Sequence, residues 1–263
     1  MTRHEIFTPH PTSTDHIATK ELVLATDLDG TFLGGSDEDR AQFYDWIEDN
    51  RARVGLIFVT GRDPGFISQL TKTGRAPRPD YVVGDVGTTI AEVGRDHLLS
   101  PIEELEAEIA EAWGDAGGMI LAALKPVQGI RLQSTGFRYR ASYDMDPARF
   151  DQKALDIVAG LGLDALISDN RYFDVLPKGV SKGPSLLRLL AHLGIDNRRT
   201  LVAGDTLNDL SMLSLGLPAV AVGGSEQALL DEVSGLDHVH AARGVGVAGI
   251  AEAILHFEML TTS

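Results

Sequence analysis

The sequence predicts an α/β fold, with a doubly wound, Rossmann-like parallel sheet as the core and a small α+β cap domain inserted into it. Short apolar runs alternate with helical patterns in both terminal parts of the chain, which is typical of a parallel sheet. Several of these runs end in polar residues, at the position where open α/β sheets bind their ligands. Between 91 and 173 the buried runs give way to alternation, which indicates antiparallel strands with one wet face.

The size and charge of the chain limit the classes of protein it can belong to. Its 263 residues are 43% hydrophobic, enough for one large core and a smaller second one. With 23 Lys and Arg against 38 Asp and Glu, the net charge is −15, which argues against nucleic acid as a partner. The absence of cysteine excludes disulfides and thiolate metal sites. No apolar run is long enough to span a membrane, and a small-molecule partner is favoured.

Residues 1–20 carry charges, prolines and three histidines, but no apolar stretch of the kind found in signal peptides. We expect them to form a flexible leader, and we expect the protein in the cytoplasm. The predicted core then comprises 21–90 and 174–263, and the predicted cap comprises 91–173.

The first strand of the predicted core is the apolar run 22–26, which reads as a strand buried on both faces. It is followed at once by Asp27, Asp29 and Gly30. Two carboxylates at such a strand end indicate a cation site or acid–base chemistry, although an Asp-rich turn that merely closes the strand fits this pair equally well.

The next segments continue as alternating helices and strands. Ser36 and Asp39 have the spacing of a capping box, which predicts the start of a helix. The second strand, 55–59, ends in Thr60, Gly61 and Arg62. A helix from Pro64 to about 73 and a third strand at 81–83 complete a β-α-β-α-β unit with right-handed crossovers.

The predicted cap contains two helices on a small antiparallel sheet. The first helix, 102–113, has an apolar stripe, and its run of glutamates is expected to face water rather than bind a metal. Alternation over 129–143 predicts antiparallel strands, followed by a helix at 151–161 and a short strand at 165–167.

After the predicted cap, short apolar runs again alternate with helical patterns, as in a parallel sheet. Ser181 is a predicted N-cap for a helix that begins at Lys182 and is stopped by Gly194. A buried strand at 200–203 ends in a second acidic cluster, which consists of Asp205, Asn208 and Asp209. The remaining elements are a strand at 219–222 and helices at 226–233 and 247–257.

The polar residues at these strand ends should converge at one edge of the sheet. Clustered carboxylates supply the hard oxygen ligands that suit Mg²⁺. Thr60 offers a hydroxyl and the next amide can hold an anion, while Lys182 adds a positive charge at a helix N-terminus. A cation, an anion cradle and a surplus carboxylate together indicate phosphoryl transfer with a candidate covalent nucleophile.

Four of these segments resemble, in the same order, the motifs of the haloacid-dehalogenase-like phosphatases, and the insert resembles the second cap type of that family. The segments are 27–31, 59–62, 181–183 and 204–209. Segments 86–90 and 173–183 are in addition similar to the sucrose-phosphate-phosphatase group. The resemblance extends over about 22 to 233. Leu207 stands where the group usually has glycine, and Gly30 where it often has asparagine.

The resemblance implies a role for each motif residue. Asp27 would be the nucleophile that forms an aspartyl phosphate, and Asp29 the general acid and then the base. The phosphoryl oxygens would be bound by Thr60, Gly61, Lys182 and Asn208. Mg²⁺ would be bound by the Asp27 carboxylate, the Asp29 backbone carbonyl and Asp205, with Asp209 acting close by or through water.

In the cap, Arg140 aligns loosely with a basic position that contacts the sugar in the sucrose-phosphate group. Gln133, Arg138 and Asn170 are further candidates for substrate contact. For any one of these residues, an equally good explanation is a strand with one solvent-exposed face, on which the side chain simply points into solvent.

Three other patterns are not expected to form sites. The stretch 244–249 matches G-x-G-x-x-G but lacks the βαβ unit of a dinucleotide site, so it is interpreted as a helix entrance. His238 and His240 share a strand face without a third ligand and are expected at the surface. Trp46 and Trp113 fit helical stripes and are expected in the core.

The function predicted from these features is that of a Mg²⁺-dependent phosphomonoesterase acting on a phosphorylated sugar or glycoside. Sucrose phosphate and mannosyl- or glucosyl-glycerate phosphates exemplify the class. Two alternatives are a sugar phosphomutase with the same core and a catalytically silent sugar-phosphate-binding protein. Release of free phosphate distinguishes the phosphatase from both.

Overall fold

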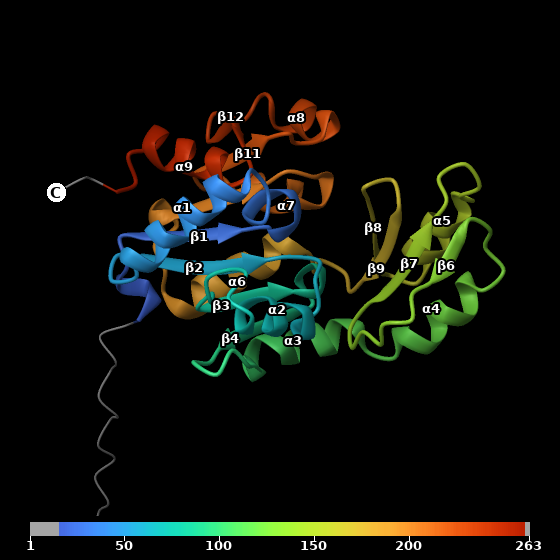
Figure 1. Ribbon diagram of the computed structural model, residues 1–263. Helices are drawn as coiled ribbons and strands as arrows, with labels where there is room; N and C mark the ends of the chain where they lie inside the picture. Colours follow the sequence, from blue (N-terminus) through green and yellow to red (C-terminus); the bar gives the residue numbers. More distant parts are fainter. Residues whose placement is uncertain (1–15, 261–263) are drawn as a thin grey trace, which may run out of the picture.

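The computed structural model describes residues 16–260, and its centre is one large sheet (Figure 1). The strand order is β12-β11-β10-β1-β2-β3-β4-β5, parallel from β12 to β3, with β4 and β5 added antiparallel. This arrangement confirms the predicted doubly wound core. The strands are β1 (Leu22–Thr26), β2 (Val54–Val59), β3 (Tyr81–Gly84), β4 (Thr89–Val93), β5 (Leu99–Pro101), β10 (Thr200–Gly204), β11 (Ala219–Gly223) and β12 (Val239–Val245).

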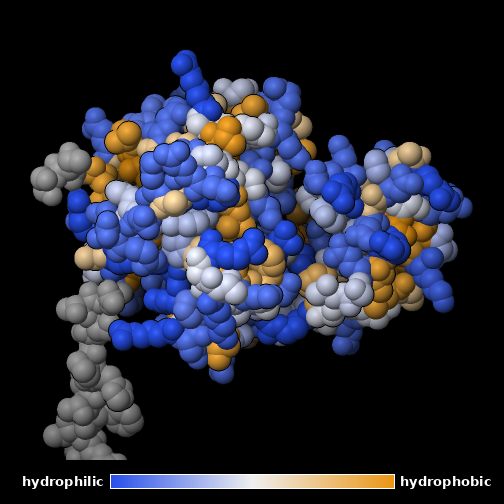
Figure 2. Space-filling view, viewed as in Figure 1, coloured by the Kyte–Doolittle hydropathy of each residue, from blue (hydrophilic) through white to orange (hydrophobic). Residues whose placement is uncertain are grey.

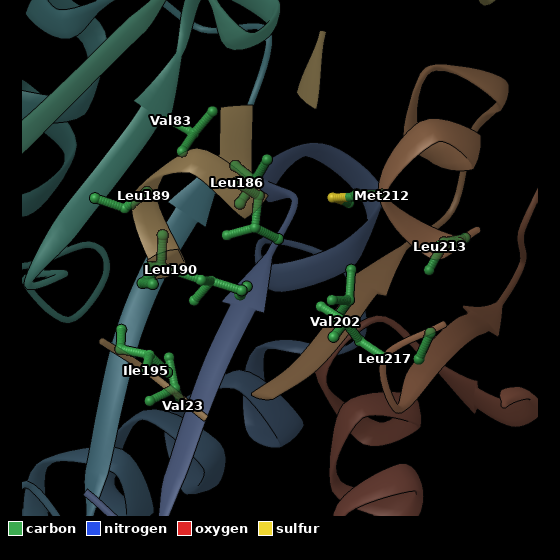
Figure 3. Close-up of a cluster of buried hydrophobic side chains, with 14 of the residues drawn as sticks. Val23, Val83, Leu186, Leu189, Leu190, Ile195, Val202, Met212, Leu213 and Leu217 are labelled. Carbon is green, nitrogen blue, oxygen red and sulfur yellow. The ribbon is translucent and has the colours of Figure 1, made fainter. Parts of the chain in front are cut away.

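Helices cover both faces of this sheet, because successive side chains of a strand point to opposite faces. Leu22 and Leu24 of β1 pack in one cluster and Val23 and Ala25 in the other, and all four are fully buried. Figure 3 shows part of the second cluster, in which Val23 lies close to Ile195, just after the end of helix α6. The helices on the first face are α1 (Asp37–Asp49), α2 (Pro64–Lys72) and α9 (Val247–His256), and those on the second are α3 (Glu103–Trp113), α6 (Lys182–Leu193), α7 (Leu210–Leu213) and α8 (Gln227–Val233).

The cap lies beside the carboxyl ends of the core strands (Figure 1). Its antiparallel sheet has the order β6-β7-β9-β8 and packs against two helices around its own apolar cluster, which includes Ile120, Val158 and Phe173. Figure 2 shows a largely hydrophilic face of the molecule, with apolar side chains gathered on the cap near α4. The cap elements are α4 (Ala116–Leu124), β6 (Ile130–Leu132), β7 (Ala141–Met145), α5 (Lys153–Gly160), β8 (Asp164–Ser168) and β9 (Tyr172–Leu176).

The boundaries of the cap differ from the predicted 91–173. Strands β4 and β5 extend the core sheet, and Leu105 and Ile109 of α3 are buried in the core cluster. Trp113, at the end of α3, packs instead in the cap cluster. The cap sheet and its helices therefore lie between Ala116 and Leu176. The antiparallel β3-β4-β5 meander has the same alternating pattern as a cap strand, so sequence periodicity does not separate the two.

The predicted flexible leader, residues 1–20, extends too far, because its last residues pack against the core. Ile17 lies in a short 3₁₀ helix, Ile17–Thr19, and is 3% exposed in the core cluster. Lys20 is also buried, and its Nζ donates to the Arg51 carbonyl at 2.8 Å. The rest of the predicted leader, 1–15, lies outside the described residues. Within 16–260, no helix is long and apolar enough to cross a membrane.

Most predicted helix ends are confirmed. Ser36 and Asp39 form the capping box of α1, and Gly194 ends α6 in the left-handed conformation. Ser181 is the N-cap of α6, but its side chain makes no capping hydrogen bond. Gly246 is the N-cap of α9, which confirms the stretch 244–249 as a helix entrance.

Trp46 and Trp113 both lie on helices, and the rings of His238 and His240 contact different groups. Trp113 is 8% exposed, whereas Trp46 is only partly buried against the core cluster. The ring of His238 contacts the Leu213 carbonyl, and that of His240 contacts the Glu252 carboxylate.

Candidate active site

The first site residue follows β1 directly. Asp27 continues the pairing with β10 through its amide, which donates to the Ala203 carbonyl at 2.9 Å, and it is only 5% exposed. The chain then turns sharply at Gly30, whose φ of +81° is a left-handed conformation that favours glycine. A Cβ at this position would overlap the carboxylate of Asp205, so the turn also needs glycine for its close approach to the loop after β10.

Lys182, the first residue of α6, is at the centre of the site. Its Nζ donates to Asp27 Oδ1, Asn208 Oδ1 and Asp209 Oδ1, each at 2.7 Å, so all three ammonium protons have an acceptor. The side chain is fully buried. Burial alone lowers the pKa of Lys182, but the carboxylates of Asp209 and Asp27 outweigh it and leave the pKa raised, so this lysine is charged.

Three carboxylates face this one ammonium. Ligand oxygens of Asp27, Asp205 and Asp209 all lie within 4.8 Å of one another. Both oxygens of Asp209 already accept hydrogen bonds, Oδ1 from Lys182 and Oδ2 from the amides of Asp205 and Thr206. Asp209 therefore holds the loop after β10 in place.

The electrostatics of this cluster fit a divalent cation. Burial raises the pKa of Asp205 to about 7, and the nearby Asp209 carboxylate adds to the shift. Burial likewise raises the pKa of Asp27, which Lys182 opposes and the carboxylates of Asp209 and Asp205 reinforce. The site has more buried negative charge than one lysine balances, and its donors are the carboxylate oxygens that Mg²⁺ prefers.

Thr60 and Gly61 follow β2 at the same edge of the sheet. Thr60 is fully buried, and its Oγ1 accepts a hydrogen bond from the Arg62 amide at 3.2 Å. The Thr60 carbonyl accepts from the Val86 amide at 3.1 Å. Among the residues that the structure describes, none accepts a hydrogen bond from the Gly61 amide, which leaves this donor free for an anion.

Asp29 is paired with an arginine that the sequence analysis did not assign to the site. Arg62 donates to both oxygens of the Asp29 carboxylate, at 2.8 and 2.7 Å, and its guanidinium lies 4.4 Å from the centre of the Phe66 ring. About half of each charged side chain is exposed, so this pair can open when a ligand arrives. The only sequence signal for Arg62 was its place beside Thr60 and Gly61.

Four predicted cap residues do not come together as one cluster. Gln133 donates to Asp144 near the β6 edge of the cap sheet, whereas Asn170 is exposed in the β8–β9 turn near the opposite edge. Arg138 forms a two-point ion pair with Glu106 at 2.7 and 2.8 Å, while about half of its side chain stays exposed. A substrate contact by Gln133, Arg138 or Asn170 stays a prediction.

Arg140 is buried between the cap and the core. Its side chain is only 5% exposed and is enclosed by the carboxylates of Asp85 and Asp174 and by the Gly61 carbonyl. Both carboxylates are buried, so they hold the guanidinium away from solvent. The guanidinium is held by protein acceptors, and the predicted contact between Arg140 and a sugar stays a prediction.

The chain is similar to known proteins over most of its length. The sequence model of the sucrose-6F-phosphate phosphohydrolase family matches residues 20–258. A glucosylglycerol-phosphate synthase of Pseudomonas anguilliseptica is 39% identical over 241 residues, which cover 91% of this chain but only 31% of that protein. A mannosylfructose-phosphate phosphatase of Agrobacterium fabrum is 29% identical over 203 residues, which cover 73% of this chain and 79% of that protein.

Among solved structures, a sucrose-phosphatase from Synechocystis in complex with sucrose and phosphate has the same fold. The TM-score is 0.81 at 24% identity, and the match covers 92% of this chain and 100% of that one.

Proposed function

Because this chain belongs to the sucrose-6F-phosphate phosphohydrolase family, we propose that it is a phosphatase that hydrolyses the phosphate monoester of a sugar or glycoside. The observation that carries this proposal is the buried contact of Lys182 with Asp27 and Asp209, beside the free Gly61 amide. It provides a carboxylate next to a cation and an anion-binding amide, which phosphoryl transfer requires.

The class of substrate is supported by the names of the relatives. They refer to phosphates of sucrose, mannosylfructose and glucosylglycerol, each of which joins a sugar to a second sugar or a small polyol. We therefore propose a phosphorylated glycoside of this kind. In this proposal the core motifs would contact only the phosphoryl group, so the cap would discriminate between glycosides.

The first step would transfer the phosphoryl group to Asp27. A carboxylate oxygen of Asp27 attacks phosphorus, the bond to the leaving oxygen breaks, and Asp29 gives that oxygen its proton. Asp29 must therefore leave Arg62 and take up a proton as the ester binds. The incoming phosphate dianion offers the Arg62 guanidinium an alternative partner.

The second step would hydrolyse the aspartyl phosphate. Asp29, now ionised, removes a proton from water as the water oxygen attacks phosphorus, and the bond to Asp27 breaks to release phosphate. Thr60 Oγ1 and the Gly61 amide would bind the phosphoryl oxygens in both steps. Lys182 Nζ would join them by exchanging one of its three present acceptors for a phosphoryl oxygen.

Mg²⁺ would be held by the carboxylates of Asp27 and Asp205 and by the Asp29 carbonyl. Asp209 would hold the loop after β10 in place through the Asp205 amide. When bound, it supplies positive charge that lets an anionic nucleophile approach an anionic ester.

A screen for phosphate release tests the proposed function. The protein with Mg²⁺ is incubated with sugar phosphates and glycoside phosphates, with Asp27→Asn as the control. We expect free phosphate from at least one glycoside phosphate with the wild type and none with the variant. Conversion to an isomeric sugar phosphate without free phosphate would identify a phosphomutase, and binding without turnover would identify a silent binding protein.

A further inference from the structure

The backbone of the loop Thr60–Arg62 is anchored at three consecutive carbonyls. The Thr60 carbonyl accepts from the Val86 amide at 3.1 Å, and the Arg62 carbonyl accepts from the Asp85 amide at 3.1 Å. The carbonyl between them, that of Gly61, accepts from Arg140 Nη2 at 3.1 Å. The Gly61 amide shares its peptide plane with the Thr60 carbonyl, so the first anchor orients this amide directly, and the other two anchors fix the chain that follows it.

The first two anchors come from a strained turn. Asp85 and Val86 have φ values of 51° and 59°, and a left-handed conformation is a clear outlier for β-branched valine. Such backbone persists only where its surroundings hold it. Gly87 abuts the start of α6, where a Cβ would overlap the Ser181 carbonyl, and Ser185 Oγ donates to the Gly87 carbonyl at 2.7 Å. The turn thus connects the loop Thr60–Arg62 with the helix that carries Lys182.

The third anchor comes from the cap. Arg140 precedes β7, and its Nη1 donates to Asp174 Oδ1 of β9 at 3.3 Å while its guanidinium lies 3.6 Å from the centre of the Phe137 ring. On the core side, the same guanidinium contacts Asp85 Oδ1 at 3.4 Å as well as the Gly61 carbonyl. One buried cation therefore joins two cap elements to the strained turn and to the loop Thr60–Arg62.

The charge of Arg140 is needed where it lies. The side chains of Asp85 and Asp174 are 11% and 8% exposed, so without the guanidinium two buried carboxylates would face each other uncompensated. Each carboxylate is also oriented by a hydroxyl of its own domain. In the core, Thr89 Oγ1 donates to Asp85 at 2.6 Å, and in the cap, Ser142 Oγ donates to Asp174.

We propose that Arg140 is a positioning residue, which makes the affinity of the core for phosphate depend on how the cap is positioned against the core. By holding the Gly61 carbonyl, it fixes the peptide that follows the Gly61 amide. By contacting Asp85, it also supports the turn whose Val86 amide holds the Thr60 carbonyl, so that the Gly61 amide faces the phosphoryl group. This inference rests on the proposed function and adds a residue that touches neither the sugar nor the phosphate. It predicts that a change in Arg140 weakens every phosphate ligand, whatever its leaving group.

The test compares Arg140→Gln and Arg140→Lys with the wild type and with Arg131→Gln. Arg131 is a matched control, because it is a cap arginine paired with Asp144 but 83% exposed. Two quantities are measured: the dissociation constant of inorganic phosphate by calorimetry with Mg²⁺, and kcat/KM for nitrophenyl phosphate and for the best glycoside phosphate. Circular dichroism and thermal unfolding report whether each variant folds.

We expect Arg140→Gln to raise the dissociation constant of inorganic phosphate about tenfold to a hundredfold, which is the effect of one lost charge-assisted contact. We expect kcat/KM for both esters to fall by the same factor. Arg140→Lys keeps the charge and should restore part of the loss, and Arg131→Gln should match the wild type. A loss confined to the glycoside phosphate, wild-type phosphate binding by a folded Arg140→Gln, or the failure of both Arg140 variants to fold would each overturn the inference. A wild type that releases no phosphate would refute the proposed function instead.

Discussion

Asp27 combines a buried position with contact to a cation, the two features that distinguish a nucleophilic carboxylate from an acid in a turn. We expect Asp27→Asn to fold normally and to lose at least about a thousandfold in kcat, because removal of an attacking group is among the costliest single changes in an active site. Phosphate release and thermal unfolding are the measurements. Asp37→Asn is the control, since the Asp37 side chain is fully exposed at the start of α1. Retention of a tenth of wild-type turnover would remove Asp27 from this role.

Asp29 is expected to act on the leaving group. Asp29→Asn should slow hydrolysis of an alkyl phosphate far more than that of nitrophenyl phosphate, because a nitrophenolate leaves without a proton donor. The measurement is the ratio of kcat/KM values for the two esters in wild type and variant. Equal losses on both esters would assign Asp29 to metal binding or to the fold rather than to proton transfer.

At this scale the sequence allowed the residues that converge at one edge of the sheet to be predicted, but not their partners. Asp27, Thr60 and Asp205 could be found because each directly follows a buried apolar run. Arg62 and Arg140 could not be placed, because their partners depend on rotamers and on contacts across distant segments. Arg140, for example, reaches a carbonyl 79 residues earlier in the chain. A motif position identifies the type of residue but not its contacts. For Arg140, the contacts are decided by its burial between Asp85 and Asp174.

At the scale of elements, the turn after β1 depends on Gly30. Gly30→Ala should be destabilised by about 1 kcal/mol through its positive φ, and its Cβ should also displace the Asp205 carboxylate. We therefore expect the variant to need a higher Mg²⁺ concentration for half-maximal activity.

Gly194→Ala is the matched control for this prediction. Gly194 also has a positive φ, +67°, but a Cβ there would meet no atom within 4 Å. It should lose similar stability while its Mg²⁺ requirement stays unchanged. If the two variants respond alike to Mg²⁺, the close approach of Gly30 to Asp205 has no part in metal binding.

The elements that sequence patterns missed share a physical cause. Helix α4 contains Gly117 and Gly118 and lacks acidic residues in its first turn, so neither propensity nor capping indicates it. It forms because Ile120 and Leu124 are buried in the cap cluster. The strands β4 and β5 are a short antiparallel extension of the core sheet, and their alternation resembles that of the cap. The parallel strands β1, β2 and β10 were predictable because burial on both faces requires continuous apolar runs.

At the scale of the whole molecule, the acidic site and the net charge of −15 oppose the binding of an anionic ester. Lys182 is the buried cation within the acidic cluster, and its three donors are already engaged. Additional positive charge should therefore be required for turnover. We expect a chelator such as EDTA to abolish phosphate release and Mg²⁺ to restore it, while Ca²⁺, with its larger and looser coordination shell, should bind but support little turnover. Full turnover in a chelated sample would contradict the metal assignment.

The same cluster links the stability of the chain to pH. Burial, together with Asp209, raises the pKa of Asp205 to about 7, whereas an unfolded Asp titrates at about 3.9. Between these values the folded protein keeps a proton that the unfolded chain has lost. The free energy of unfolding of the metal-free protein should therefore fall as pH rises through this window, and the loss should be complete above about pH 8.

Mg²⁺ should act in the opposite sense, because it binds the ionised carboxylates that the folded protein otherwise disfavours. We expect metal-free protein to melt at a lower temperature at about pH 8 than at about pH 5.5, and Mg²⁺ to raise the melting temperature more at the higher pH. Asp205→Asn carries no titrating group at this position, so its melting temperature should change less with pH and respond less to Mg²⁺. Thermal unfolding at both pH values, with and without Mg²⁺, measures all of these differences. An Asp205→Asn variant with the wild-type response to both would show that another group sets the pH dependence and that Asp205 does not bind the metal.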